Sequence, residues 1–86
     1  MKLNQEFLIH HSGKEDVLVP TGNADFSGVV RGNRTFGTIV TLLKEETTEE
    51  AVVDAVKAQY DAPEGAIEKD VHEILKVLRQ IHALDE

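Results

Sequence analysis

The hydrophobic positions change their spacing along the chain, from short runs in the first third to a helical repeat in the remainder. Residues 7–11 and 17–19 are rich in aromatic and branched side chains, and the polar run 12–15 between them has the composition of a hairpin turn. Pro20 lacks an amide donor and ends the second run, and residues 26–31 form a third run that contains Gly28. The pattern predicts a small antiparallel sheet of three strands.

Three helices are predicted after the sheet. Asn33 is a natural N-cap, and apolar residues then recur at helical spacing to about residue 44. Thr47 and Glu50 have the spacing of a capping box for a second helix that ends near residues 60–61. Pro63 is expected in the first turn of a third helix. The buried face of that helix is predicted to consist of Ile67, Val71, Ile74, Leu78 and Ile81.

The apolar arc of the third helix is wider than one packing surface requires, since Leu75 lies on one side of the predicted stripe and Val77 and Leu84 lie on the other. Core packing or a contact between two copies explains Val77 and Leu84 as well as a binding groove does, so these interpretations stay open. The element order predicts an α+β fold of the winged helix-turn-helix type, a three-stranded antiparallel sheet followed by three helices, with residues 1–86 as a single domain.

The formal net charge of −7 has the wrong sign for a winged helix that binds DNA. Affinity for duplex DNA comes largely from Lys and Arg side chains that neutralise phosphates, so we expect no nucleic-acid partner. Residues 45–86 carry twelve acidic and four basic side chains, whereas residues 1–44 carry four and five. A winged-helix transcription regulator stays as an alternative, but its recognition helix would begin with Glu64, Glu68 and Asp70, which repel phosphate.

The sequence contains no strong motif for a disulfide, a metal site, a phosphate loop or a catalytic site. The chain has no Cys, which excludes disulfides, thiolate zinc sites and cysteine nucleophiles. His10 and His11 are neighbours on a strand and point to opposite faces, so no metal site is expected. The glycine spacing of residues 28–35 does not fit a phosphate loop, and the glutamates of residues 45–50 suit a solvated helix start. We therefore expect no enzyme activity, no catalytic residues and no cofactor.

No apolar stretch is long enough to span a bilayer, and the N-terminal residues lack the apolar segment of a signal peptide. We expect a cytoplasmic protein without a membrane partner.

Several segments occur in a distinctive order: Gly28-Val29-Val30-Arg31-Gly32-Asn33-Arg34-Thr35 through Ile39 and Leu42-Leu43, then Thr48-Glu49-Glu50, Tyr60-Asp61, Asp70-Val71 and Leu75 to Leu78. Over roughly residues 6–84, this order and spacing resemble the PqqD-like proteins. That family is named for the small chaperone of pyrroloquinoline quinone biosynthesis. It includes the leader-peptide recognition elements of ribosomally made, post-translationally modified peptides.

The resemblance implies that the chain binds the leader of a precursor peptide as a fourth strand, between the third strand and the third helix. The resemblance does not decide which flank of the third helix faces the peptide, so the flank that carries Leu75 and Arg79 stays open as an alternative to the one named below. Catalysis would reside in a modifying enzyme. The resemblance implies a radical S-adenosylmethionine (SAM) enzyme as the usual partner, while leader peptidases and other modifying enzymes stay open as alternatives. Carried over to this sequence, the expected contacts are Phe26, Gly28, Val29, Val30 and Arg31 on the strand and Glu73, Val77 and Gln80 on the helix.

An open sheet edge can accept an extended peptide on physical grounds as well, because its unpaired amides and carbonyls gain hydrogen bonds from an added strand. Gly28 would let a second backbone approach closely, and Arg31 can pair with an acidic residue of the leader. The same edge can also pair with a second copy, so both a monomer and a homodimer are expected possibilities. A protein–protein adaptor of another kind is the remaining alternative.

Overall fold

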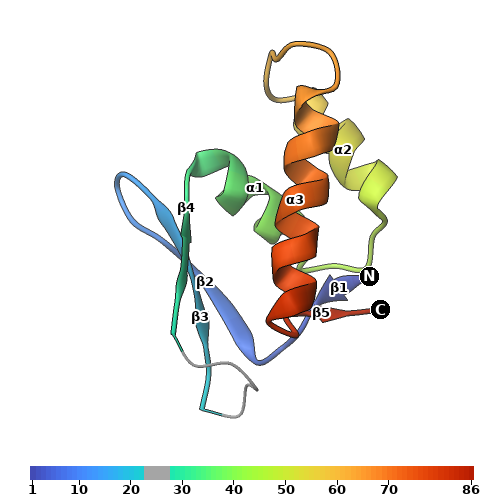
Figure 1. Cartoon of the computed structure of the whole chain (residues 1–86). Helices are drawn as coiled ribbons and strands as arrows, with labels where there is room; N and C mark the ends of the chain where they lie inside the picture. Colours follow the sequence, from blue (N-terminus) through green and yellow to red (C-terminus); the bar gives the residue numbers. More distant parts are fainter. Residues whose placement is uncertain (23–27) are drawn as a thin grey trace.

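The computed structural model describes residues 1–22 and 28–86 (Figure 1). Strands β2, β3 and β4 form an antiparallel sheet in that order, and the short strands β1 and β5 pair antiparallel with each other. The predicted α+β order of three strands followed by three helices is confirmed, whereas the winged-helix label stays a prediction. The elements in chain order are β1 (Lys2–Leu3), β2 (Phe7–His11), β3 (Asp16–Pro20), β4 (Val30–Gly32), α1 (Arg34–Leu42), α2 (Glu49–Lys57), α3 (Ala66–Gln80) and β5 (Leu84–Asp85).

The β2–β3 hairpin forms at the residues that the pattern predicts. Ser12 closes the turn twice, because its amide and its hydroxyl both donate to the carbonyl of Glu15, at 3.0 and 2.7 Å. In the resulting register Ile9 lies opposite Leu18, and Leu18 lies opposite Val30. Leu18 is fully buried, so this row of side chains faces the core and the alternate row faces outward.

The third strand is shorter than predicted. The sequence pattern predicts a strand over residues 26–31, but β4 includes only Val30–Gly32. Gly28 has a φ of 114°, which takes the backbone out of the extended conformation and ends the ladder before it reaches Val29. Phe26 lies outside the described residues.

The helix starts confirm one predicted cap and correct another. The side chain of Asn33 accepts a hydrogen bond from the Phe36 amide at 3.0 Å, so α1 begins where predicted. For α2 the N-cap is Thr48, which accepts from the Ala51 amide at 3.1 Å, and not Thr47. The amide of Thr47 donates to the carbonyl of Met1, which holds Thr47 in the segment before the helix.

Helix α3 starts later than predicted and turns a different face to the core. Pro63 precedes the helix, whose N-cap is Gly65 at a φ of 84°. Leu75, predicted to flank the buried stripe, is fully buried at its centre, whereas Ile74 and Ile81 are only half-buried. The buried face of α3 consists of Ile67, Val71, Leu75 and Leu78.

Strands β1 and β5 are absent from the sequence prediction. After α3, His82 has a φ of 61°, and the reversed chain brings Leu84 opposite Leu3. Leu84, predicted to lie on the third helix, is therefore a half-buried strand residue that packs against the core. Within residues 1–22 and 28–86, no helix is both long and apolar enough to cross a membrane.

Candidate functional site

A groove of about 330 Å³ lies between β4 and α3. Figure 1 shows the arrangement: β4 leads directly into α1, and α3 stands beside both. Three elements therefore supply the walls of the groove, two of them consecutive in the chain and the third, α3, about 30 residues further on. Its lining residues are Val30, Arg31, Gly32, Asn33, Phe36, Glu73, Ile74 and Val77.

The floor of the groove depends on the pairing of Gly32 with Phe36. A Cβ atom on Gly32 would lie 2.3 Å from Cγ of Phe36, which is closer than two non-bonded carbon atoms can approach. The absence of a side chain at Gly32 thus lets the buried Phe36 ring pack directly against β4. Together with the half-buried Ile74, this ring gives the groove an apolar floor.

One wall of the groove is an open sheet edge. Among the described residues, β4 has a strand partner on one side only, since the sheet order is β2-β3-β4 and β3 occupies the other side. An edge of this kind presents backbone amides and carbonyls that an incoming strand can pair with. The groove therefore combines a backbone edge with an apolar floor.

Two charged residues border the groove. Glu73 is exposed on α3 and lines the groove. Arg31 also lines it, but Nη1 of its guanidinium lies 3.8 Å from Oε1 of Glu15 in the β2–β3 hairpin. Both of these side chains are accessible to solvent, so their contact is a loose surface ion pair.

The structure brings together four of the residues singled out in the sequence, namely Val30, Arg31, Glu73 and Val77. Gly28 and Val29 precede β4 and do not line the groove. The side chain of Val29 is exposed, and this residue directly precedes the first residue of β4. The exposed Gln80 is the last residue of α3 and does not line the groove either.

Sequence reasoning missed half of the lining. Ile74 was expected in the core, and its partial burial is what opens it to the groove. The sequence pattern assigns the turn and start of the first helix to Gly32, Asn33 and Phe36, and does not indicate a groove there. The one local signal is a glycine directly before the helix cap, which allows the Phe36 ring to pack against the strand.

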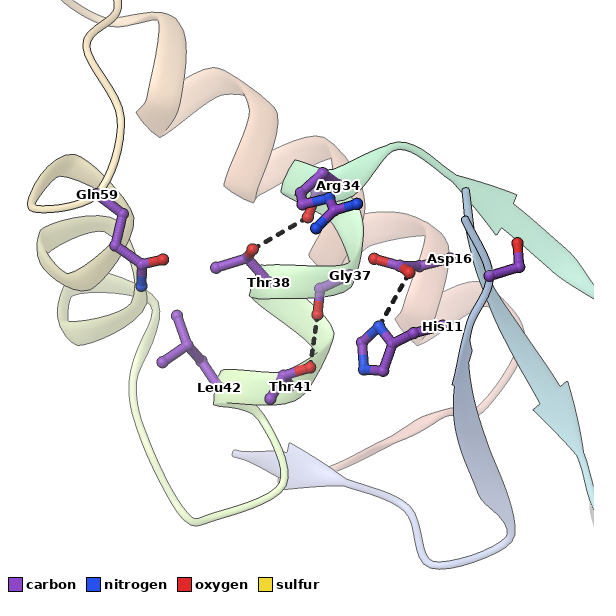
Figure 2. Close-up of a pocket in the computed structure, with 9 residues that line it drawn as sticks. His11, Asp16, Arg34, Gly37, Thr38, Thr41, Leu42 and Gln59 are labelled. Carbon is purple, nitrogen blue, oxygen red and sulfur yellow. Dashed lines mark hydrogen bonds and ion pairs between the residues drawn. The ribbon is translucent and has the colours of Figure 1, made fainter. Parts of the chain in front are cut away.

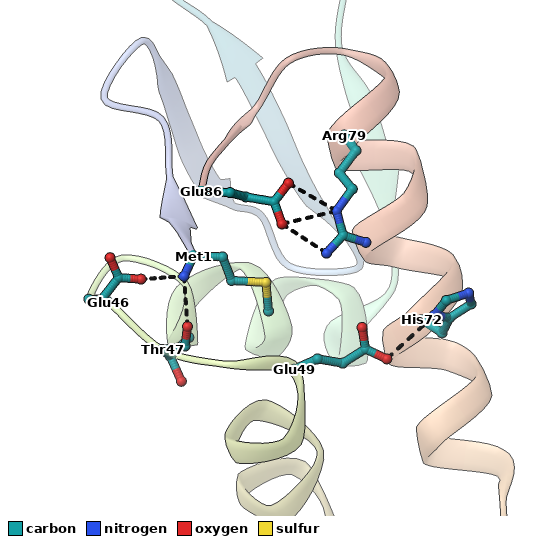
Figure 3. Close-up of polar contacts among 7 residues, drawn as sticks. All are labelled: Met1, Glu46, Thr47, Glu49, His72, Arg79 and Glu86. Carbon is teal, nitrogen blue, oxygen red and sulfur yellow. Dashed lines mark hydrogen bonds and ion pairs between the residues drawn. The ribbon is translucent and has the colours of Figure 1, made fainter.

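The opposite flank of α3 is engaged elsewhere. Leu75 is fully buried, and Arg79 donates to the carboxylate of Glu86 from Nε at 3.2 Å and from Nη2 at 3.0 Å (Figure 3). The guanidinium of Arg79 lowers the pKa of Glu86 below its ordinary value, because it donates these hydrogen bonds to the ionised form. This flank fastens the chain that follows α3, although the Arg79 side chain itself stays exposed.

A second recess, of about 380 Å³, lies between the β2–β3 hairpin, α1 and Gln59 in the segment after α2 (Figure 2). Asp16 is buried there, with Oδ1 2.9 Å from Nδ1 of His11. The hydroxyls of Thr38 and Thr41 donate to carbonyls of α1 itself, at 3.0 and 2.7 Å. Asp16, Thr38 and Thr41 thus already have hydrogen-bond partners within the protein.

The histidine pair of β2 separates as the strand geometry requires. His11 pairs with Asp16, and His10 lies opposite Val17 on the outer face. Within the part of the chain that the structure describes, no group of three His, Cys, Asp or Glu side chains could hold a metal ion.

Comparison with known proteins places this geometry in a family. The family described as Coenzyme PQQ synthesis protein D (PqqD) matches residues 15–84. The solved structure of TbiB1 in complex with the TbiA(beta) leader peptide is similar to the chain, with a TM-score of 0.77, 25% sequence identity and coverage of 99% of this chain and 95% of that one. A search of curated proteins found no match. By its fold and by the extent of the family match, the chain belongs to the PqqD family.

Proposed function

We propose that this protein captures the leader of a ribosomal precursor peptide as an added strand beside β4 and presents the peptide to a modifying enzyme. Membership of the PqqD family supports this role, and so does the similarity to TbiB1, whose structure contains a leader peptide. The proposed contact surface extends along residues 26–31 and one flank of α3. Its residues are Phe26, Gly28, Val29, Val30, Arg31, Glu73, Val77 and Gln80.

The observation that carries the proposal is the apolar groove beside an open strand edge. Three large hydrophobic side chains are exposed in the described part of the chain, and two of them, Val29 and Val77, lie next to β4 or in the groove. An extended peptide seated there would gain backbone hydrogen bonds worth about 0.5–1.5 kcal/mol each. It would also cover apolar surface at about 25 cal/mol for each Å² removed from water.

In this role the protein does no chemistry of its own. By holding the leader, it raises the concentration of the precursor's modifiable segment near the partner enzyme, to about the millimolar range of short tethers. We propose a radical SAM enzyme as that partner, which rests on the family alone. The site of action would be the cytoplasm, where ribosomes release precursor peptides.

The direct test is titration of the isotope-labelled protein with a synthetic peptide that has the leader sequence of a short precursor reading frame found next to its gene. We expect amide shifts to cluster on residues 26–32 and on α3 around Glu73 and Val77. The substitution Val77→Asp should weaken binding at least ~10-fold, because it buries a charge in the groove. Leu8→Asp is the matched control: Leu8 is also exposed, but it lies on β2, outside the groove, and its substitution should leave the affinity unchanged.

Two results would contradict the proposal. One is a set of amide shifts confined to hairpin residues 12–15, and the other is tight binding of the leader by the Val77→Asp variant. Duplex DNA serves as the second titrant, since binding that weakens steeply with salt would restore the transcription-regulator alternative. Sedimentation of the free and peptide-bound protein would show whether the protein is a monomer or a homodimer.

A further inference from the structure

Strand β4 presents its side chains to two different surfaces. Val30 lies opposite the buried Leu18 and packs against the core, so it belongs to the face that meets the helices. Arg31 lies opposite Val17 in the next register position, and its side chain is 69% exposed. Because successive side chains alternate, the guanidinium of Arg31 belongs to the outer face of the sheet.

On that outer face the guanidinium already has an internal partner. Glu15 reaches it from the β2–β3 hairpin, with the closest nitrogen and oxygen atoms 3.8 Å apart. Ser12 fixes the backbone of Glu15 in the hairpin turn through its two hydrogen bonds to the Glu15 carbonyl. The neighbouring Asp16 is buried and paired with His11, so Glu15 is the hairpin carboxylate that Arg31 meets.

A strand added to β4 would follow the same alternation. A residue directly across from Arg31 would place its side chain on the outer face, within reach of the guanidinium, while the residues on either side of it would face the groove. An outer-face carboxylate at that position would meet a cation and compete with Glu15 for it. Apolar side chains on either side would meet the floor formed by Phe36 and Ile74.

Resting on the proposed function, we infer that the leader presents an acidic residue between two apolar residues, that this acid pairs with Arg31, and that Glu15 competes with it in the free protein. Glu15 thus weakens binding by occupying Arg31 and by repelling the incoming carboxylate. It sets the selectivity of the edge, because a leader without the acid gains nothing from displacing it.

The test compares the affinity of the synthetic leader for four proteins: the parent, Glu15→Gln, Arg31→Gln and the double variant. Exposed ion pairs of this kind change affinities by about two- to fivefold. We expect Glu15→Gln to bind more tightly by that factor, Arg31→Gln to bind more weakly, and Glu15→Gln to have no further effect in the Arg31→Gln protein. A leader whose acidic residue is replaced by its amide should lose the gain from Glu15→Gln.

Glu50→Gln is the charge-matched control, because it removes the same charge from the exposed surface of α2 and should not alter the affinity. If the parent binds the leader and neither Glu15→Gln nor Arg31→Gln changes its affinity, the inference is wrong while the proposed function stands. A leader that binds in the groove but has no acidic residue between apolar ones also overturns the inference. If the parent does not bind the leader at all, the proposed function fails first.

Discussion

Gly37 in α1 lies so close to the buried carboxylate of Asp16 that a Cβ atom on Gly37 would be 1.7 Å from Oδ2 of that carboxylate (Figure 2). The substitution Gly37→Ala should therefore destabilise the protein by about 1–3 kcal/mol, because Asp16 and the strand that carries it must move. Urea unfolding measures the change. Gly13→Ala is the control, since a Cβ there meets nothing within 4 Å and the free energy of unfolding should change little.

A double-mutant cycle tests whether Asp16 is the cause of that loss. In an Asp16→Ala background the carboxylate is gone, so Gly37→Ala should cost less than it does in the parent protein. A smaller cost should remain, because the Cβ atom of residue 16 would still lie 2.8 Å from the Cβ added at Gly37. An unchanged cost in the double variant would mean that another neighbour, and not Asp16, requires the glycine.

The cap of α2 distinguishes two adjacent threonines. Thr48→Ala should lower the free energy of unfolding by about 1 kcal/mol, because the Ala51 amide loses its side-chain acceptor. Thr47→Ala keeps that hydrogen bond and should have a smaller effect. Thermal or urea unfolding of the two variants checks the order, and a larger loss for Thr47→Ala would restore the cap predicted from the sequence.

Adjacent faces of α3 should separate stability from binding. Leu75→Ala removes a fully buried side chain and should cost about 2–5 kcal/mol of stability. Val77→Ala removes an exposed one that lines the groove, so it should leave the unfolding transition nearly unchanged while it weakens leader binding. Unfolding curves and peptide titrations of both variants provide the comparison, and equal losses of stability would contradict the observed burial.

The ion pair of Lys57 and Glu68 gives a small pH dependence. The ammonium of Lys57 donates to Glu68 at 2.6 Å, which lowers the pKa of Glu68 below its ordinary 4.5 and raises the pKa of Lys57 above 10.5. Folding thus favours the ionised pair, whose contribution is present between these two values. It is lost as the pH falls through the lowered pKa of Glu68 or rises through the raised pKa of Lys57.

The matching variant is Glu68→Gln, measured by thermal unfolding across the pH range. It should lower the midpoint at neutral pH by a few degrees at most, since the pair is exposed, and the difference from the parent should vanish in acid. Asp70→Asn, which removes a nearby exposed charge, is the control. A difference that grows on acidification would be contrary to the expected sign.

Local signals in the sequence identified the elements that depend on few neighbours. The Asn33 cap needs only the amide three residues later, and the β2–β3 hairpin needs only its own turn and the alternation of its strands. The second cap was assigned one residue early because Thr47 and Thr48 are chemically equivalent in sequence. A distant contact with Met1 decides between them.

The buried face of α3 depends on packing that no local pattern contains. Ile74 and Leu75 are both apolar and lie about 100° apart on a helix, so either can face the core. The pairing of β5 with β1 and the packing of α2 against α3 select Leu75, and this leaves Ile74 partly exposed over the groove. The family resemblance thus named α3 as a wall of the groove without deciding between its flanks, and no local pattern predicted that Ile74 would form part of the floor.

The brevity of β4 limits what the protein can retain in a crowded cell. Within residues 1–22 and 28–86, an arbitrary unfolded chain that meets this edge finds a strand of three residues, Val30–Gly32, to pair with. A few hydrogen bonds of about 0.5–1.5 kcal/mol each do not repay the ~4–15 kcal/mol that association costs. Very short edge strands are one way in which proteins avoid uncontrolled pairing and aggregation. Backbone pairing with β4 alone is therefore too weak to hold most extended polypeptides, and a bound segment would also need side chains that fit the groove.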